Sequence, residues 1–247
     1  MPKAGRYHEG VPCWVELAAV DLGRARRFYG GLFAWEFVEL PDRTVATLRG
    51  AQVAGLTARP AGGPQSWTTY LAVADAERTA QAVRAAGGRL LREPYELPEE
   101  GRAALAADPV GAVFGLRQGT LWQGAGLVDE PAAFSWSEQH SPEPDAARAF
   151  YRRVFGYSYG REVDGATVFR VDGMPVGGIA RRPGPGWAVH FGAADTDRAV
   201  ERVRDLGGTV RSGPEPTPYG RRAVVADDGG AAFTLVGPVS TAEPAAA

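Results

Sequence analysis

The chain has 247 residues, of which 45% are hydrophobic and 23% charged, a composition typical of globular proteins that bury a sizeable core. Its 27 basic and 29 acidic residues give a net charge of −2, which argues against nucleic-acid and anionic-membrane partners, and its one cysteine excludes an internal disulfide. There is no apolar stretch of about 18–20 residues and no apolar signal core after Met1. We therefore expect a cytoplasmic protein, a monomer or homodimer, whose partner is a small-molecule ligand rather than nucleic acid or a membrane.

The predicted elements begin with a strand over residues 15–20, followed by a helix that starts after Asp21. Three short strands are predicted next, over residues 36–40, 44–49 and 52–57. The first unit therefore reads strand–helix–strand–strand–strand.

The same order is predicted three times more. A strand and a helix occupy residues 69–86, and two further strands stand before Pro142 and before Asp195, each with a helix after it. Short strands are predicted over residues 167–171 and 175–180, as in the first unit.

Motifs recur at a nearly constant spacing. Trp14-Val15-Glu16 returns as Trp136-Ser137-Glu138, at an offset of 122, and Phe28-Tyr29 returns as Phe150-Tyr151 at the same offset. The segment 108–116 returns as 227–235, at an offset of 119. Because seven such matches keep one order, the chain is predicted to be a tandem duplication.

The predicted fold is α+β, with four βαβββ modules in two domains. The first domain is expected to span residues 1–120 and the second residues 121–247, with two modules in each and a flexible tail from about residue 238. The segments 59–64 and 182–186, rich in proline and glycine, are predicted linkers between modules.

These modules resemble the vicinal oxygen chelate superfamily, which includes glyoxalase I, bleomycin-resistance and fosfomycin-resistance proteins and extradiol dioxygenases. The resemblance rests on the closing motif 108–116 and on the segment from Pro12 to Phe33, which is similar to a four-module, two-half bacterial branch. It implies two glyoxalase/bleomycin-resistance-like domains with sheets curled into half-barrels. A shared fold leaves the chemistry open, because one scaffold hosts many functions.

In metal-dependent members of the superfamily, ligands stand on the first strand of a module and in the closing motif. The resemblance places the first-strand positions at Trp14, Thr68, Trp136 and Ala188. The closing positions are Gly115 and Thr234. None of these is a usual ligand for a divalent ion, so the sequence predicts no cofactor, no metal ligands and a cavity lined by these residues instead.

Alternation along the strands extends the list of cavity residues. Side chains two residues apart share one face of a strand, which adds Glu16, Tyr70, Glu138 and His190 to the cavity. The opposite face is apolar, as helix packing requires, except in the third module, where two polar residues, Ser137 and Gln139, interrupt it.

We interpret Glu16, Glu138 and His190 as the catalytic candidates, since a carboxylate removed from water needs a partner or serves as a base. A structural alternative pairs the glutamates with Tyr70, His190, Arg102 or Arg221. If neighbouring modules pair, Glu16 faces Tyr70 and Glu138 faces His190. If the first module pairs with the fourth, Glu16 faces His190 and Glu138 faces Tyr70.

Trp14 and Trp136 are predicted either to stack on a planar ligand or to fill the core. His140 lies two residues beyond Glu138 and is predicted to face the same cavity, where Glu138, His140 and His190 could form an atypical metal site.

Three functions remain open from the sequence. The first is metal-free binding of small aromatic or hydrophobic molecules in the domain cavities, for antibiotic sequestration or natural-product metabolism. The second is a glyoxalase-like lyase or isomerase that uses a glutamate, a Glu–His pair or an atypical metal site. The third is a homologue that acts through a protein partner.

Overall fold

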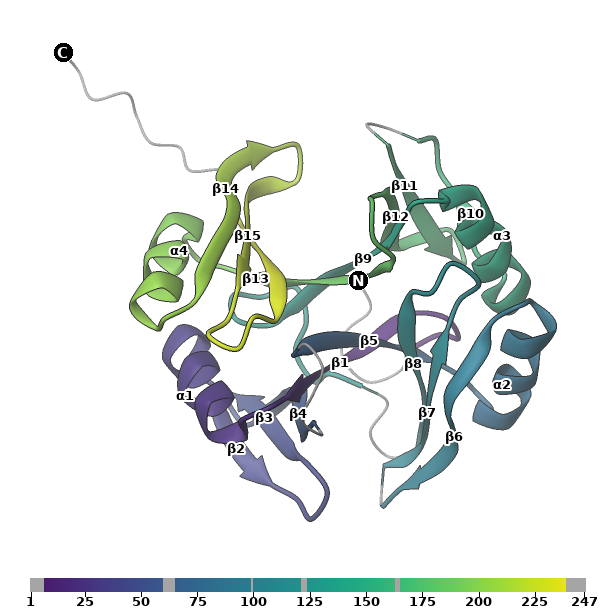
Figure 1. Cartoon of the computed structure of the whole chain (residues 1–247), viewed down its shortest axis with the longest axis horizontal. Helices are drawn as coiled ribbons and strands as arrows, with labels where there is room; N and C mark the ends of the chain where they lie inside the picture. The colour runs from purple at the N-terminus through teal and green to yellow at the C-terminus, as the bar shows by residue number, and fades with distance from the viewer. Residues whose placement is uncertain (1–6, 60–64, 99, 121–123, 163–164, 239–247) are drawn as a thin grey trace.

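The computed structural model describes residues 7–59, 65–98, 100–120, 124–162 and 165–238. These residues form two eight-stranded sheets that lie next to each other, with helices at both ends of the molecule (Figure 1). The predicted linker at residues 59–64 falls largely outside the described residues, as does the predicted flexible tail beyond residue 238.

The first sheet is built from two modules. The elements of the first module are β1 (Pro12–Ala19), α1 (Leu22–Phe33), β2 (Glu36–Glu39), β3 (Thr44–Leu48) and β4 (Ala51–Ala58). Those of the second are β5 (Ser66–Ala72), α2 (Ala76–Ala85), β6 (Arg89–Leu97), β7 (Gly101–Ala107) and β8 (Val113–Gly119).

The second sheet repeats this order. The third module contains β9 (Phe134–Ser141), α3 (Pro144–Phe155), β10 (Ser158–Tyr159), β11 (Ala166–Val171) and β12 (Met174–Arg181). The fourth contains β13 (Gly186–Gly192), α4 (Thr196–Asp205), β14 (Thr209–Thr217), β15 (Gly220–Ala226) and β16 (Ala232–Gly237).

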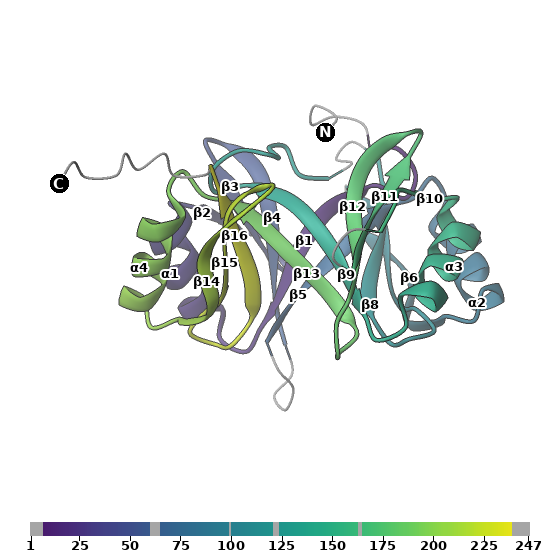
Figure 2. The ribbon, with the colours of Figure 1, turned by 90° about the horizontal axis from the view of Figure 1, so that it is seen from above.

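The predicted α+β fold of four βαβββ modules is therefore confirmed. Each sheet joins two neighbouring modules through their first strands, in the orders β2-β3-β4-β1-β5-β8-β7-β6 and β10-β11-β12-β9-β13-β16-β15-β14. The central strands are antiparallel, and each is flanked by the parallel last strand of its own module. The sheets curl without closing into barrels (Figure 2). The boundary between residues 120 and 121 stays a prediction.

Local sequence signals set the helix ends. Asp21, Asp75 and Asp195 precede α1, α2 and α4, and each side chain accepts a hydrogen bond from a backbone N–H in the first turn. Helix α3 begins at Pro144, after Glu143, whose side chain makes no capping hydrogen bond, and it ends before Gly156, which adopts a left-handed conformation.

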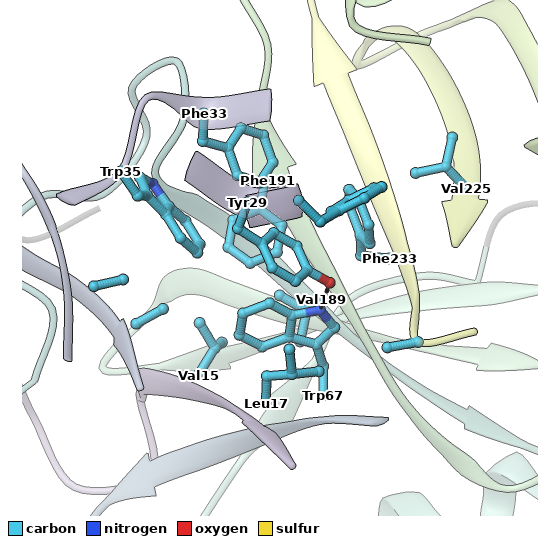
Figure 3. Close-up of a cluster of buried hydrophobic side chains, with 14 of the residues drawn as sticks. Val15, Leu17, Tyr29, Phe33, Trp35, Trp67, Val189, Phe191, Val225 and Phe233 are labelled. Carbon is cyan, nitrogen blue, oxygen red and sulfur yellow. Dashed lines mark hydrogen bonds between the residues drawn. The ribbon is translucent and has the colours of Figure 1, made fainter. Parts of the chain in front are cut away.

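Among the described residues, two hydrophobic cores lie between the two domains, and a third, which includes Trp14 and Tyr70, is formed mainly by the first domain. One core combines α1 and β1 of the first domain with β13, α4 and β16 of the second, and its aromatic side chains gather around Tyr29 (Figure 3). A second core combines β5, α2 and β8 with α3, β11 and β12 at the other end of the molecule. Each module therefore buries its helix face against a module of the other domain, and in Figure 1 α1 lies beside α4 and α2 beside α3.

Two equivalent polar networks cross the domain boundary. Tyr29 donates a hydrogen bond to Asp227 (2.8 Å) and accepts one from the Trp67 indole (2.9 Å). In the other core Tyr151 donates to Asp108 (3.0 Å) and accepts from the Trp187 indole (3.1 Å). The aspartate of each closing motif is thus held by a tyrosine of the other domain.

The polar residues of the third module belong to this boundary. Ser137 shares a hydrogen bond with Thr69 (2.8 Å), and Gln139 donates to Asp108 (3.1 Å). Both side chains are fully buried. They interrupt the apolar pattern of the strand because their hydrogen-bond partners lie in the other domain. No helix within the described residues is long and apolar enough to cross a membrane.

Candidate functional site

The concave face of the first domain carries the residues predicted to line its cavity. Tyr70 donates a hydrogen bond to Glu16 (3.3 Å), and the Thr57 hydroxyl donates to the same oxygen (3.3 Å). Trp14 stands opposite Tyr70 in the β1–β5 register, and Glu16 opposite Thr68. Of the two pairings considered from the sequence, neighbouring modules are therefore the ones that pair, and Glu16 faces Tyr70.

A glycine beside each glutamate makes room for its side chain. A Cβ on Gly55 would lie 3.0 Å from Glu16 Oε2 and 3.2 Å from Trp14 Nε1. The equivalent Gly178 lies beside Glu138 and Trp136 in the second domain, at looser distances. The two concave faces therefore have the same arrangement. In each domain a tryptophan and a glutamate of the first strand lie next to a glycine of the neighbouring parallel strand, β4 or β12.

The first domain contains a buried charge cluster that the sequence did not predict. Arg43, from the turn between β2 and β3, pairs with Glu100 (2.8 Å), which precedes β7. Arg117 of β8 pairs with the other oxygen of the same carboxylate. All three side chains are less than a tenth exposed. This group, called here the Arg43–Glu100–Arg117 clasp, joins the two ends of the curled sheet.

The predicted arginine partners of the glutamates are wrong. Arg102 pairs with Glu96 (2.9 Å) and Glu77 (3.1 Å) instead. Arg221 forms a two-pronged ion pair with Asp197 of α4. Alternation could have identified Arg117, which lies two residues beyond Gly115, whereas Arg43 and Glu100 stand in turns where no period applies.

Burial dominates the electrostatics of Glu16. Desolvation raises the pKa of its carboxyl group above the usual value, and the guanidinium groups of Arg117 and Arg43 oppose this only in part. Both cations are also paired with the carboxylate of Glu100.

The concave face of the second domain brings Glu138 and His140 together. His140 Nε2 is hydrogen-bonded to Glu138 Oε1 at 2.9 Å, and Arg182 approaches the same oxygen at 4.0 Å. His190 of β13 stands opposite Trp136 in the register and is 6% exposed. The predicted Glu138–His190 proximity is present as an electrostatic interaction, while the hydrogen bond of Glu138 goes to His140.

The two glutamates therefore differ electrostatically. The pKa of Glu138 is lowered: burial alone would raise it, but the hydrogen bond from His140 and the positive charge of Arg222 outweigh burial. Burial lowers the pKa of His190 to about 3, so its ring is neutral near pH 7, and its buried Nε2 has no hydrogen-bond partner within the described residues. Glu138 is thus ionised at neutral pH, beside a neutral imidazole with a free ring nitrogen.

The positions that bind metal in other superfamily members are occupied differently here. Gly115 stands opposite Tyr70 in the register, and a Cβ there would lie 2.0 Å from the Tyr70 ring, so this ring covers the closing position of the first domain. In the second domain Thr234 stands opposite His190. Within the described ranges, no three His, Cys, Asp or Glu side chains lie close enough to hold a metal ion. The predicted atypical site at Glu138, His140 and His190 is therefore not formed as a ligand set.

Two open cavities lie next to the clasp of the first domain. One of about 470 Å³ is lined by Tyr7, Ala72, Val73, Arg117 and Gln118, among others. Another of about 260 Å³ lies at the turn that carries Arg43. Arginines of the clasp thus border both cavities.

The fold and these concave faces define a two-domain protein of the vicinal oxygen chelate superfamily. The sequence profile of the glyoxalase-like domain matches residues 14–117 and again residues 138–236. The chain belongs to this glyoxalase-like family.

Curated relatives match almost the whole chain. "Putative glyoxylase CFP32" of Mycobacterium tuberculosis is 34% identical, with 96% of this chain and 98% of the relative covered. The anthracycline biosynthesis protein DauV of a Streptomyces species is 33% identical, with 98% of each chain covered.

Solved structures share the fold at low sequence identity. The Mn(II)-bound glyoxalase of Novosphingobium aromaticivorans has a TM-score of 0.70 and 20% identity, covering 94% of this chain and 84% of its own. The 2,3-dioxygenase LapB of a Pseudomonas species has a TM-score of 0.69 and 14% identity, covering 98% and 97%.

The prediction of no cofactor is wrong. A protein with this fold is a Mn(II)-bound glyoxalase, so the fold family points to a metal cofactor, and the metal-free part of the predicted function is corrected with it. The described residues do not themselves form a fitting site: Tyr70 covers the closing position of one domain, and Glu138 with His140 supplies two donors in the other.

Proposed function

We propose that the second domain binds a small planar aromatic molecule on its concave face, as part of natural-product metabolism. The observation that carries this proposal is the grouping of Trp136, Glu138, His140 and His190 on β9 and β13. Trp136 is partly exposed, whereas its counterpart Trp14 is 2% exposed, so the second-domain indole offers a face to a ligand.

The polar groups beside Trp136 would orient the ligand. The Glu138 carboxylate accepts hydrogen bonds from hydroxyl groups, and the free Nε2 of the neutral His190 supplies one further bond. A mostly apolar wall with a few fixed polar groups is the usual composition of a small-molecule site. The name of one relative, the anthracycline biosynthesis protein DauV, points the same way, because anthracyclines are planar aromatic molecules that carry hydroxyl groups.

Equilibrium binding of 1,8-dihydroxyanthraquinone to the full chain tests this proposal. Trp136→Ala should weaken binding at least tenfold, equivalent to about 1.4 kcal/mol, through loss of the stacking surface. Trp14→Phe in the first domain is the matched control and should leave the dissociation constant unchanged. Absence of binding, or equal effects of the two variants, would reject the proposal.

A second candidate function is proton transfer on the bound molecule. The specific observation in its favour is the Glu138–His140 hydrogen bond of 2.9 Å, together with a lowered pKa that keeps Glu138 ionised as a base. The test is deuterium uptake at the methylene carbon of 1,8-dihydroxyanthrone in D₂O under nitrogen. Glu138→Gln should abolish uptake above the uncatalysed rate while changing binding less than tenfold; uptake equal to that of the unmodified protein would rule out this role.

A further inference from the structure

The first domain holds two buried hydrogen-bond donors that have no acceptor. Trp14 Nε1 and Arg117 Nε are inaccessible to solvent and make no hydrogen bond within the described part of the chain. The side chains that carry them are 2% and 3% exposed. They are also neighbours, since Arg117 Cζ lies 5.2 Å from the centre of the Trp14 ring. Buried donors are nearly always satisfied, so an unsatisfied pair points to a missing acceptor.

The clasp fixes Arg117 so that its Nε stays free. Glu100 binds a terminal nitrogen of Arg117 and a terminal nitrogen of Arg43, and both of its oxygens are thereby engaged. One buried carboxylate therefore balances two buried guanidinium groups. Two other acids among the described residues lie near these cations: Asp42, which pairs with Arg43 at 3.0 Å but is half exposed to water, and buried Glu16, which interacts electrostatically with Arg117 and Arg43. The Nε–H of Arg117 is the donor that these acids leave without an acceptor within the described residues.

A cavity borders Arg117, although Trp14 is not among the residues that line it. The cavity of about 470 Å³ includes Arg117 in its wall, together with Tyr7, His8, Glu9, Gln118, Gly119 and the small apolar residues 72–74. Glu9 pairs with Arg78 at 3.5 Å, so its negative charge is shared with a cation. The volume of the cavity falls in the range that small organic ligands occupy. A ligand there could place a compact apolar body against Ala72 and Val73.

We infer that the first domain contains a binding site for a small organic carboxylate, whose oxygens accept hydrogen bonds from Arg117 Nε and Trp14 Nε1 while its apolar body fills the neighbouring cavity. A carboxylate matches the planar geometry of a guanidinium and accepts from two donors at once. Glu16, another acid on this face, is engaged with Tyr70 and Thr57.

This site is separate from the proposed function of the second domain. The position equivalent to Arg117, at the offset of 119 residues, is Val236, so the second domain lacks the guanidinium that defines the site. Binding of a carboxylate by the first domain therefore stands or falls independently of aromatic binding by the second.

The test is a benzoate titration of ¹⁵N-labelled full-length protein, observed at the indole N–H signals of its six tryptophans. The Trp14 signal, assigned by its loss in Trp14→Phe, should shift in a saturable way with benzoate. Benzamide, which has the same shape without the charge, should bind at least tenfold more weakly. Inorganic phosphate at the same ionic strength should cause no comparable shift.

Variants make the result decisive. Arg117→Lys keeps the positive charge for Glu100 but removes the Nε donor, and should weaken benzoate binding at least tenfold. Arg198→Lys, the same substitution at an arginine of the second domain that is 86% exposed, should leave the titration unchanged. The inference is overturned if benzamide or phosphate shifts the Trp14 signal as benzoate does, or if Arg117→Lys has no effect.

Discussion

The network around Tyr29 should contribute strongly to stability, because it joins the two domains through a buried carboxylate. Tyr29→Phe removes the hydroxyl that donates to Asp227 at 2.8 Å and accepts from Trp67 at 2.9 Å, and leaves the ring in place. Tyr29 is fully buried, so water does not replace either bond.

The expected loss follows from the two bonds. A hydrogen bond to a charged group contributes about 1.5–3 kcal/mol, and an indole N–H left buried without a partner costs about 1–3 kcal/mol. Because the phenyl ring is easier to bury than the phenol, we expect a net loss of about 2–4 kcal/mol in the free energy of unfolding. Urea denaturation followed by circular dichroism measures it.

Two further variants check the reasoning. Tyr151→Phe breaks the equivalent bonds to Asp108 and Trp187 and should cost a similar amount. Tyr219→Phe is the control: this side chain is 82% exposed, and its change should stay within about 0.5 kcal/mol. If Tyr29→Phe matched the control, the polar networks would not hold the domains together.

Three other changes have defined outcomes. Burial lowers the pKa of His190 from 6.5 to about 3, so between these pH values the unfolded chain binds a proton that the folded chain does not. Acidification should therefore lower the free energy of unfolding by about 1.4 kcal/mol per pH unit. His190→Gln should remove this contribution from the pH dependence, as measured by denaturation curves from about pH 6.5 to 4.5. Gly115→Ala should cost about 1–3 kcal/mol in thermal unfolding, because the new methyl group collides with Tyr70, whereas Gly186→Ala, which meets no atom within 4 Å, serves as its control. Glu100→Gln should cost about 3–5 kcal/mol by urea denaturation, because it leaves two buried arginines without their carboxylate; a loss below about 1 kcal/mol would show that the clasp is not a stabilising contact.

The sequence was most informative where a period or a repeat applied. Alternation placed Glu16 next to Tyr70 and Trp14 on one concave face, and the repeat at 119–123 residues identified the equivalent residues of the second domain. Strand alternation and the internal repeat can both be recognised in a single sequence, because neither depends on knowing which distant residues come into contact.

Contacts between domains left no such signal. Ser137 interrupts an apolar face because its partner Thr69 lies in the other domain, and pairing of distant polar residues has no period. The clasp was missed for the same reason, since Arg43 and Glu100 stand in turns that only the curl of the sheet brings together. Sequence position likewise could not show that Glu138 would bond to His140 rather than to His190.

A crystal structure of the full chain with 1,8-dihydroxyanthraquinone tests the proposed function most directly. The account predicts the ring system stacked on Trp136 at a separation of about 3.5–4 Å, with a hydroxyl within about 2.5–3.0 Å of Glu138. A ligand found only in the first domain, or bound without contact to Trp136, would contradict it.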